Sequence, residues 1–135
     1  MSRTAIETAG AFDTRYFLYY EDLDLSLRLQ KAGFTLLTVP GASLRHKVAG
    51  STGVGSPCRA YHMACSSVIF FMKHASPLQA PFVLAWRLAS AAKTLASLLS
   101  RGRRQLAGAY VAGLADGLRE NRDRTARYCR QDASA

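Results

Sequence analysis

A glycine- and serine-rich stretch divides this sequence into two unlike parts. Residues 48–60 read VAGSTGVGSPCRA, a composition typical of loops, because glycine and serine favour turns over regular elements. Regular structure ahead of the loop must therefore be built from residues 1–47, and no internal repeat is visible on either side. With 135 residues in total, the chain is near the lower end of what buries a self-sufficient core. We expect one domain at most, made of two differently built segments.

The segment 21–32, ahead of the loop, allows two interpretations. Its leucines at 23, 25, 27 and 29 alternate, which by period alone favours a strand. Its acidic residues lie at the start, Arg28 and Lys31 lie near the end, and Gly33 follows. This charge order suits a helix dipole, and the glycine suits a C-terminal cap. We expect a helix.

Two short strands are expected after this helix. Residues 34–39 (FTLLTV) are β-prone and end at the turn dipeptide Pro40-Gly41, and residues 42–46 continue beyond it. Residues 61–128 are mostly helix-forming, with apolar runs at 68–72 and 81–99. The expected fold class is therefore α/β: a helix and a short strand pair, followed by a mainly α-helical extension.

Charge is distributed unevenly along the chain. All nine acidic residues lie within 7–24 and 116–132, whereas residues 25–115 hold eleven Lys and Arg and no acid. Such a stretch attracts anions such as phosphates, nucleic acid or anionic lipid headgroups, although a merely solvated basic surface has the same composition. Aromatic and basic residues interleaved on one surface would favour nucleic acid. The aromatic residues cluster in the acidic segment instead, so we expect no nucleic-acid partner.

The cysteines and the N-terminus point to a reducing cytoplasm. Cys58, Cys65 and Cys129 are odd in number and form no CxxC pair, so the sequence predicts neither a disulfide framework nor a zinc motif. We interpret them as packing or surface residues. The N-terminus MSRTAIETAG has no apolar core of a signal peptide, and no run of about 18 uncharged apolar residues predicts a spanning helix.

One long motif points to a known family. Residues 10–34, GAFDTRYFLYYEDLDLSLRLQKAGF, resemble the segment "GGFDE.FF.Y.EDVDL..RL...G" of family 2 glycosyltransferases of the GT-A fold, especially the rhamnosyltransferase-like members. Val39-Pro40 and the following residues to His46 resemble the family's "VP.A...H" strand pair, and Gly50-Ser51 its "H..G.S". The segments from Tyr61 to Lys73-His74 and over 112–117 resemble its "YY..RN.L....KH" and "GL.DGL". These last two are weak individually and count because their order is right.

The resemblance implies a general base. In the family the second residue of the Glu-Asp pair takes the proton of the acceptor hydroxyl, which corresponds to Asp22, with Glu21 beside it orienting the acceptor or bonding nearby backbone. Such a base typically contributes ~10²–10⁴ in rate. Tyr20 and Asp24 would lie on the acceptor side of the same site. The alternative is that Glu21, Asp22 and Asp24 only cap a helix. Although Asp22-Leu-Asp24 spells D-x-D, its setting differs from the family's metal-binding motif, which closes a buried strand.

The resemblance also implies a metal and a lid. Departure of a nucleoside diphosphate needs charge neutralisation, so Mn²⁺ or Mg²⁺ is the implied cofactor, with His46 as its ligand from this chain. An ordinary histidine between Arg45 and Lys47 is the alternative. The loop at Gly50 and Ser51 would fold over the diphosphate as a mobile lid, or serve as a plain linker. The family's Arg-Asn after the paired tyrosines is replaced here by Cys65-Ser66, which puts the contacts of that pair in doubt.

Residues 81–100 (PFVLAWRLASAAKTLASLLS) suggest a membrane contact. The stretch is interrupted by Arg87 and Lys93 and followed by further arginines, so we expect an amphipathic helix on an anionic bilayer surface, with Phe82 and Trp86 near the interface. A helix packed on its own domain core is the alternative. The expected location is cytoplasmic, peripheral on the inner face of the plasma membrane.

These expectations combine into one hypothesis. Residues 1–56 would be the acceptor-side part of a GT-A domain, 57–128 a helical and membrane-associated extension, and 129–135 a tail. The function would be that of a fragment of an inverting glycosyltransferase, passing a sugar from a nucleotide-sugar to a saccharide or lipid-linked acceptor in cell-surface polysaccharide synthesis. The nucleotide-binding half is expected to lie outside this sequence, leaving the isolated chain inactive. The alternatives are a non-catalytic basic module binding membrane or nucleic acid, and a remnant docking to a partner chain.

Overall fold

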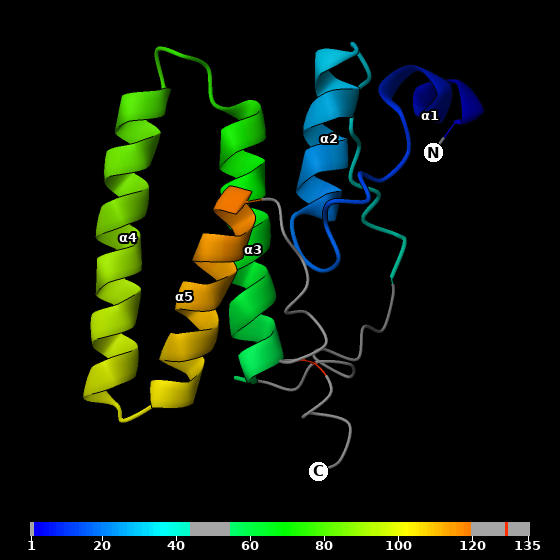
Figure 1. Cartoon of the computed structure of the whole chain (residues 1–135). Helices are drawn as coiled ribbons and strands as arrows, with labels where there is room; N and C mark the ends of the chain where they lie inside the picture. Colours follow the sequence, from blue (N-terminus) through cyan, green and yellow to red (C-terminus); the bar gives the residue numbers. More distant parts are fainter. Residues whose placement is uncertain (1, 44–54, 120–128, 130–135) are drawn as a thin grey trace.

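The computed structural model describes residues 2–43, 55–119 and 129, and this part of the chain is helical (Figure 1). Five helices follow one another along the chain: α1 (Arg3–Ala9), α2 (Glu21–Lys31), α3 (Pro57–His74), α4 (Ala80–Ser100) and α5 (Arg104–Arg119). Figure 1 shows α3 in the middle, with α2 on one side of it and α5 and α4 on the other. The candidate site is built where α2 meets α3.

Helices α3 and α5 form the tightest contact because small residues face each other. A Cβ atom added to Gly113 would lie 2.3 Å from the carbonyl oxygen of Tyr61, and one added to Gly117 would lie 2.8 Å from that of Cys65. Only glycine allows two backbones to approach this closely. The Tyr61 hydroxyl, buried between the helices, donates to the Asp116 carboxylate at 2.9 Å. Close packing and a buried hydrogen bond together hold α5 on α3.

Helix α2 is defined at its end by local sequence. Gly33 has a φ of 85°, its amide donates to the carbonyl of Gln30, and the amide of Phe34 donates to that of Leu29. This is the Schellman arrangement that ends many helices. On its inner face α2 buries Leu25 and Leu29, which pack with Ala5 of α1. The helix expected over 21–32 is confirmed.

Helix α4 differs from the others in having no buried residue. It contacts α5 and leaves large apolar side chains in solvent, among them Phe82 (78% exposed) and Trp86 (59%). By length and composition it is long and apolar enough to cross a membrane, which we did not expect from the sequence. An apolar groove of about 450 Å³ runs between α3, α4 and α5. Residues of all three helices line it, such as Met72, Leu88 and Leu114.

The α/β prediction is wrong for the described residues, which contain no strand. Residues 34–39 are β-prone, yet they form no regular element, and Leu37 is 83% exposed. Strand propensity depends on packing against neighbouring strands, and two isolated strands are marginal in water. Within the described residues nothing offers 34–39 a sheet to join, and most of the second expected strand lies outside them. Helix α1 was not expected from the sequence.

The prediction for the cysteines is wrong for two of the three. Cys58, in the first turn of α3, is joined by a disulfide to Cys129, 71 residues further along the chain. Cys65 forms no disulfide and is buried in α3, as a packing residue would be. No spacing rule links Cys58 to Cys129, because their proximity depends on where α3 and the C-terminal part of the chain lie in space.

Candidate functional site

The site begins at a strained turn that leads into α2. Tyr19 and Tyr20 both have positive φ, 65° and 67°. This left-handed conformation costs a non-glycine residue on the order of 1–3 kcal/mol, so the surrounding structure must hold it. Contacts to α3 do so. The Ser66 hydroxyl donates to the carbonyl of Leu18 at 2.7 Å, and the Tyr20 ring packs at 5.3 Å from the ring of Phe70. The start of α2 is thereby fixed against α3.

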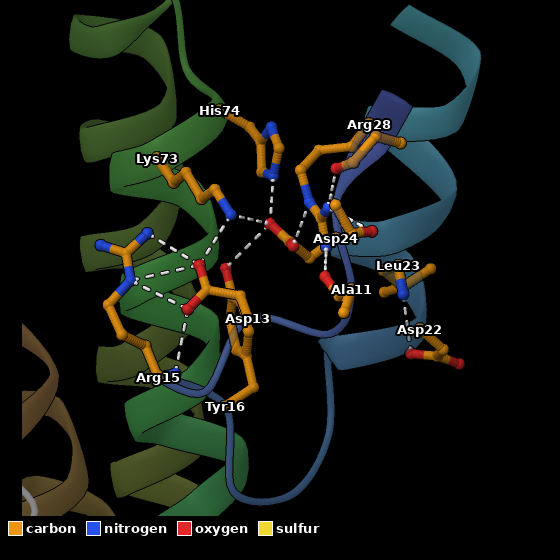
Figure 2. Close-up of polar contacts among 12 residues, drawn as sticks. Ala11, Asp13, Arg15, Tyr16, Asp22, Leu23, Asp24, Arg28, Lys73 and His74 are labelled. Carbon is orange, nitrogen blue, oxygen red and sulfur yellow. Dashed lines mark hydrogen bonds and ion pairs between the residues drawn. The ribbon is translucent and has the colours of Figure 1, made fainter. Parts of the chain in front are cut away.

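The Glu21-Asp22 pair occupies the first turn of α2, directly after the strained tyrosines. The Asp22 carboxylate is exposed, and one of its oxygens accepts from the amide of Leu23 at 2.8 Å. In Figure 2 it lies apart from the cluster of charged groups between α2 and α3. The Oε2 atom of Glu21 is buried, and no hydrogen-bond partner for it is found among the described residues. The pair therefore combines an accessible carboxylate with a neighbour whose hydrogen-bonding capacity is not fully used.

Asp24 lies two residues further along α2 in a different environment. Its side chain is fully buried, and two cations and an imidazole surround it: Arg28 one turn along α2, and Lys73 and His74 at the end of α3 (Figure 2). The closest N···O distances are 2.8 Å to Arg28, 2.7 Å to Lys73 and 2.8 Å to His74. Asp24 was expected on the acceptor side of the site or as an exposed acid of the first turn. The structure places it in the centre of an ion-pair network, out of reach of solvent.

The network lowers the pKa of Asp24. Burial by itself would raise the pKa, but the hydrogen bonds from Lys73, His74 and Arg28 outweigh it and bring the pKa below its usual value. Asp24 is therefore charged at neutral pH. A charged carboxylate that is already paired with cations is a poor proton acceptor, so Asp24 is unsuited to act as a general base.

A second carboxylate extends the network towards the strained turn. Asp13 accepts from Arg15 at 2.9 Å and from Lys73 at 2.7 Å, so that Lys73 bridges Asp13 and Asp24. The hydrogen bonds from Arg15, together with Lys73, hold the pKa of Asp13 well below its usual range despite partial burial. The Tyr16 hydroxyl reaches Asp24 at 3.4 Å, and burial together with the two nearby carboxylates raises its pKa.

Arg28 connects the network to the segment that follows α1. Its guanidinium donates to the carbonyls of Ala9, Gly10 and Ala11, the last at 2.7 Å. This places a positively charged group at the end of α1. It also gives hydrogen-bond donors to carbonyls at and just after the end of α1, where a helix leaves carbonyls without partners of its own. The network thus ties α1, the strained turn, α2 and α3 into one unit around Asp24.

The remaining residues predicted from the sequence lie outside the described part of the chain. His46, Gly50 and Ser51 belong to residues 44–54, so the metal ligand and the lid stay predictions. Around Asp22 the described residues bring together no group of three carboxylate or imidazole side chains. The described residues therefore do not form a Mn²⁺ or Mg²⁺ site by themselves.

Several residues of the site were not identified from the sequence. Lys73 and His74 belong to a segment that resembles the family's, but no role for them could be read from it, and Asp13 looked like one acid among several. Lys73 is 60 residues from its partner Asp13 in the sequence, and His74 is 50 residues from its partner Asp24. The signal was the regional charge pattern: because acids are confined to the two ends, a cation in the middle of the chain, such as Lys73, can pair only over long range.

The comparison with known proteins gives a partial match. Over 89 residues the chain is 43% identical to the N-acetylglucosaminyl-diphospho-decaprenol L-rhamnosyltransferase of Mycobacterium tuberculosis, in strain CDC 1551 / Oshkosh and likewise in strain ATCC 25618 / H37Rv. The match covers 64% of this chain and 28% of that enzyme, so this chain corresponds to less than a third of its length. No family model and no solved structure matches significantly. The resemblance to rhamnosyltransferases of family 2 is confirmed to this extent.

Proposed function

We propose that this chain is the acceptor-side part of an inverting glycosyltransferase, with Asp22 as the general base. The observation that carries the proposal is the contrast between two aspartates of one helix. Asp24 is buried and paired with Arg28, Lys73 and the His74 imidazole, whereas Asp22 is exposed and has no ion pair among the described residues. Of the two, only Asp22 can meet an acceptor. The partial identity to a rhamnosyltransferase supports the reaction class.

The proposed reaction requires from this chain mainly one carboxylate, positioned to take a proton from the acceptor hydroxyl. As the acceptor hydroxyl attacks the anomeric carbon of the donor, a C–O bond forms, the bond to the departing diphosphate breaks, and Asp22 takes the hydroxyl proton. Glu21, whose Oε2 is buried without a hydrogen-bond partner among the described residues, would orient the acceptor or bond nearby backbone. Mn²⁺ or Mg²⁺, with His46 as a ligand, stays part of the proposal for the diphosphate. The role of Asp22 does not depend on it.

The structure supports a lipid-linked acceptor over a soluble saccharide. The relative acts, by its name, on a decaprenol-linked sugar. In this chain α4 exposes apolar side chains along its length, and the groove between α3, α4 and α5 is lined mostly by carbon. At the groove the Arg87 guanidinium lies 5.2 Å from the centre of the Phe71 ring, which offers a cation beside an apolar channel. A polyprenyl diphosphate is complementary to both, because its diphosphate is an anion and its chain is apolar. A location on the cytoplasmic face of the membrane follows from this proposal.

The test uses the mycobacterial relative as a host. Its matching segment is replaced by residues 1–135 of this chain, and transfer to a decaprenol-linked acceptor is measured in single turnover. Asp22→Asn should lower transfer by about 10²–10⁴ while donor affinity hardly changes, because the substitution removes basicity and keeps size. Glu7→Gln is the matched control, since Glu7 is an exposed acid of α1 outside the charge network around Asp24, and it should leave transfer unchanged. An Asp22→Asn chimera with near-normal transfer would refute the assignment.

A further inference from the structure

Three side chains that bind metals in many proteins meet at the start of α3. Cys58 and His62 lie one turn apart on that helix, and Cys129 reaches them from the C-terminal part of the chain. The two sulfurs and the imidazole nitrogen all lie within 4.8 Å of one another, and Cys129 Sγ is 3.4 Å from His62 Nε2. Within the described residues this is the one cluster of three such ligands.

Two residues of the cluster are buried, Cys129 is half-buried, and aromatic rings border the cluster. Cys58 is 2% and His62 3% exposed. The His62 ring lies 5.0 Å from the ring of Phe17 and 5.0 Å from that of Tyr61, measured between centres. Such walls fix the orientation of a ligating imidazole and limit the access of water, as the shell around a metal centre does.

We propose that, when its thiols are reduced, this cluster binds one thiophilic divalent cation, for which Zn²⁺ is the best match. Zinc takes Cys sulfur at about 2.3 Å and His nitrogen at about 2.0–2.1 Å in a tetrahedral arrangement, which puts its ligand atoms roughly 3.5–3.8 Å apart. The pair of Cys129 and His62, at 3.4 Å, is just below this range. The fourth position would be left for water or a further ligand.

The charges favour this assignment over an oxygen-preferring cation. Two thiolates and a neutral imidazole form a soft donor set that selects Zn²⁺ over Mg²⁺ or Ca²⁺. Both thiolates would be neutralised by the cation, and two thiol protons would be released for each ion bound. In this structure the two sulfurs are joined as a disulfide. Disulfide and metal use the same sulfurs, so each state excludes the other, and the site would be open only under reducing conditions.

The proposal is independent of the glycosyltransferase function, because it concerns the opposite end of α3 from Lys73 and His74. Its expected effect is to hold the C-terminal part of the chain, through Cys129, on the first turn of α3. The disulfide has the same effect in the oxidised chain. A metal would therefore preserve this link in a reducing compartment, where disulfides rarely persist.

The experiment compares the reduced and oxidised forms of the whole chain. Protein prepared without oxygen and with its disulfide reduced is titrated with Co²⁺, a coloured substitute for Zn²⁺. We expect one equivalent to bind, with a thiolate-to-cobalt charge-transfer band and the intense visible bands of a tetrahedral site, and Zn²⁺ to bleach them with release of two protons. The oxidised chain should show none of these signals. Absence of the charge-transfer band in the reduced chain, or equal binding by the oxidised one, would overturn the proposal.

Variants assign the ligands. Cys58→Ser and His62→Asn should each weaken Co²⁺ binding by about 10-fold or more, since each loses one of three protein ligands. Cys65→Ser is the matched control, because Cys65 is a buried cysteine of the same helix that forms no disulfide, and it should bind like the wild type. Binding that survives Cys58→Ser unchanged would place the metal elsewhere. Should Cys58→Ser fail to fold, the reduced and oxidised wild type decide the question alone.

Discussion

Helices α3 and α4 are consecutive and similar in length, yet the chain treats them in opposite ways. Among its 18 residues α3 buries eight, including His62, Ser66 and Ser67, which are polar. Among its 21 residues α4 buries none, although it is the more apolar of the two and carries Phe82 and Trp86 in solvent. Burial in this molecule therefore does not follow hydrophobicity along the sequence.

The difference shows what holds a helix inside this fold. Helix α3 is enclosed because it meets partners on two sides: the glycine-bearing face of α5, which permits close approach, and the charge network of α2, which ends on Lys73. Helix α4 has neither kind of partner for most of its surface. An exposed apolar helix of this length is a site of interaction rather than a core element. Three variants, each altered at a different contact or surface, test this contrast, from the largest expected effect on stability to the smallest.

The largest effect is expected at the network that joins α2 to α3. Asp24→Asn removes the negative charge between Arg28, Lys73 and His74, which leaves the partly buried Arg28 without its carboxylate and Lys73 with Asp13 alone, so the free energy of unfolding should fall by about 3 kcal/mol. Asp22→Asn, two residues away and exposed, should cost no more than about 0.3–1 kcal/mol from the helix dipole. Urea denaturation of both variants measures the difference. Equal losses would mean that the network does not hold α3.

The same network makes the free energy of unfolding depend on pH, and this dependence can be measured on the wild type. Because the pKa of Asp24 is lower in the folded chain than the ~3.9 of an unfolded aspartate, the unfolded chain binds more protons as the medium becomes acidic. The stabilisation is fully present above about pH 5 and is lost as pH falls through about 4 towards the lowered pKa. The Asp24→Asn chain should show a flatter curve, keeping only the contribution of Asp13, whose pKa is also lowered.

The next effect is expected at the contact of α3 with α5. Gly113→Ala places a Cβ 2.3 Å from the Tyr61 carbonyl oxygen, which forces the helices apart, and the unfolding free energy should fall by about 2–3 kcal/mol. Gly108→Ala lies in the same helix with nothing within 4 Å of the added atom, so it should stabilise by about 0.5–1 kcal/mol. Opposite signs in thermal or urea unfolding are the expected result. Similar changes for both would show that α5 is not closely packed on α3.

The smallest effect on stability is expected on α4. The double substitution Phe82→Ser and Leu99→Ser, at exposed positions near the two ends of the helix, should change unfolding by within about 0.5 kcal/mol for each site. It should, however, weaken flotation with anionic vesicles by about 10-fold or more, because each side chain buried in lipid contributes about 1.5–3 kcal/mol. Wild-type capture should weaken as salt rises, since screening acts over about 10 Å at 0.1 M. A large loss of stability would instead make α4 a core helix.

Predictions from local sequence and predictions from spatial neighbours fared differently. Helix α2 was predictable because its acids, its cations and Gly33 act on the helix ends within a few residues. Helix in the stretch now seen as α3, α4 and α5 was predictable because most of its residues favour helix by local propensity. The prediction of a strand at 34–39 was wrong because a strand needs a neighbouring strand to pair with, and propensity does not say whether the fold provides one. The disulfide between Cys58 and Cys129 was not predicted, because 71 residues separate the two cysteines and no local pattern links them.

The two aspartates of α2 separate most clearly what the sequence determined from what the tertiary structure decided. By sequence alone Asp22 and Asp24 are the same residue type in the first turn of the same helix, and a helix with acids in its first turn is all that follows. The resemblance to a family favoured Asp22, and the structure supplies a physical difference: Asp24 lies against the end of α3, where Lys73 and His74 neutralise it, and Asp22 faces solvent. A helix forms through hydrogen bonds between near neighbours, so the sequence contains it. The charge state and accessibility of a carboxylate depend on groups about 50 residues away, which only the folded chain brings to it.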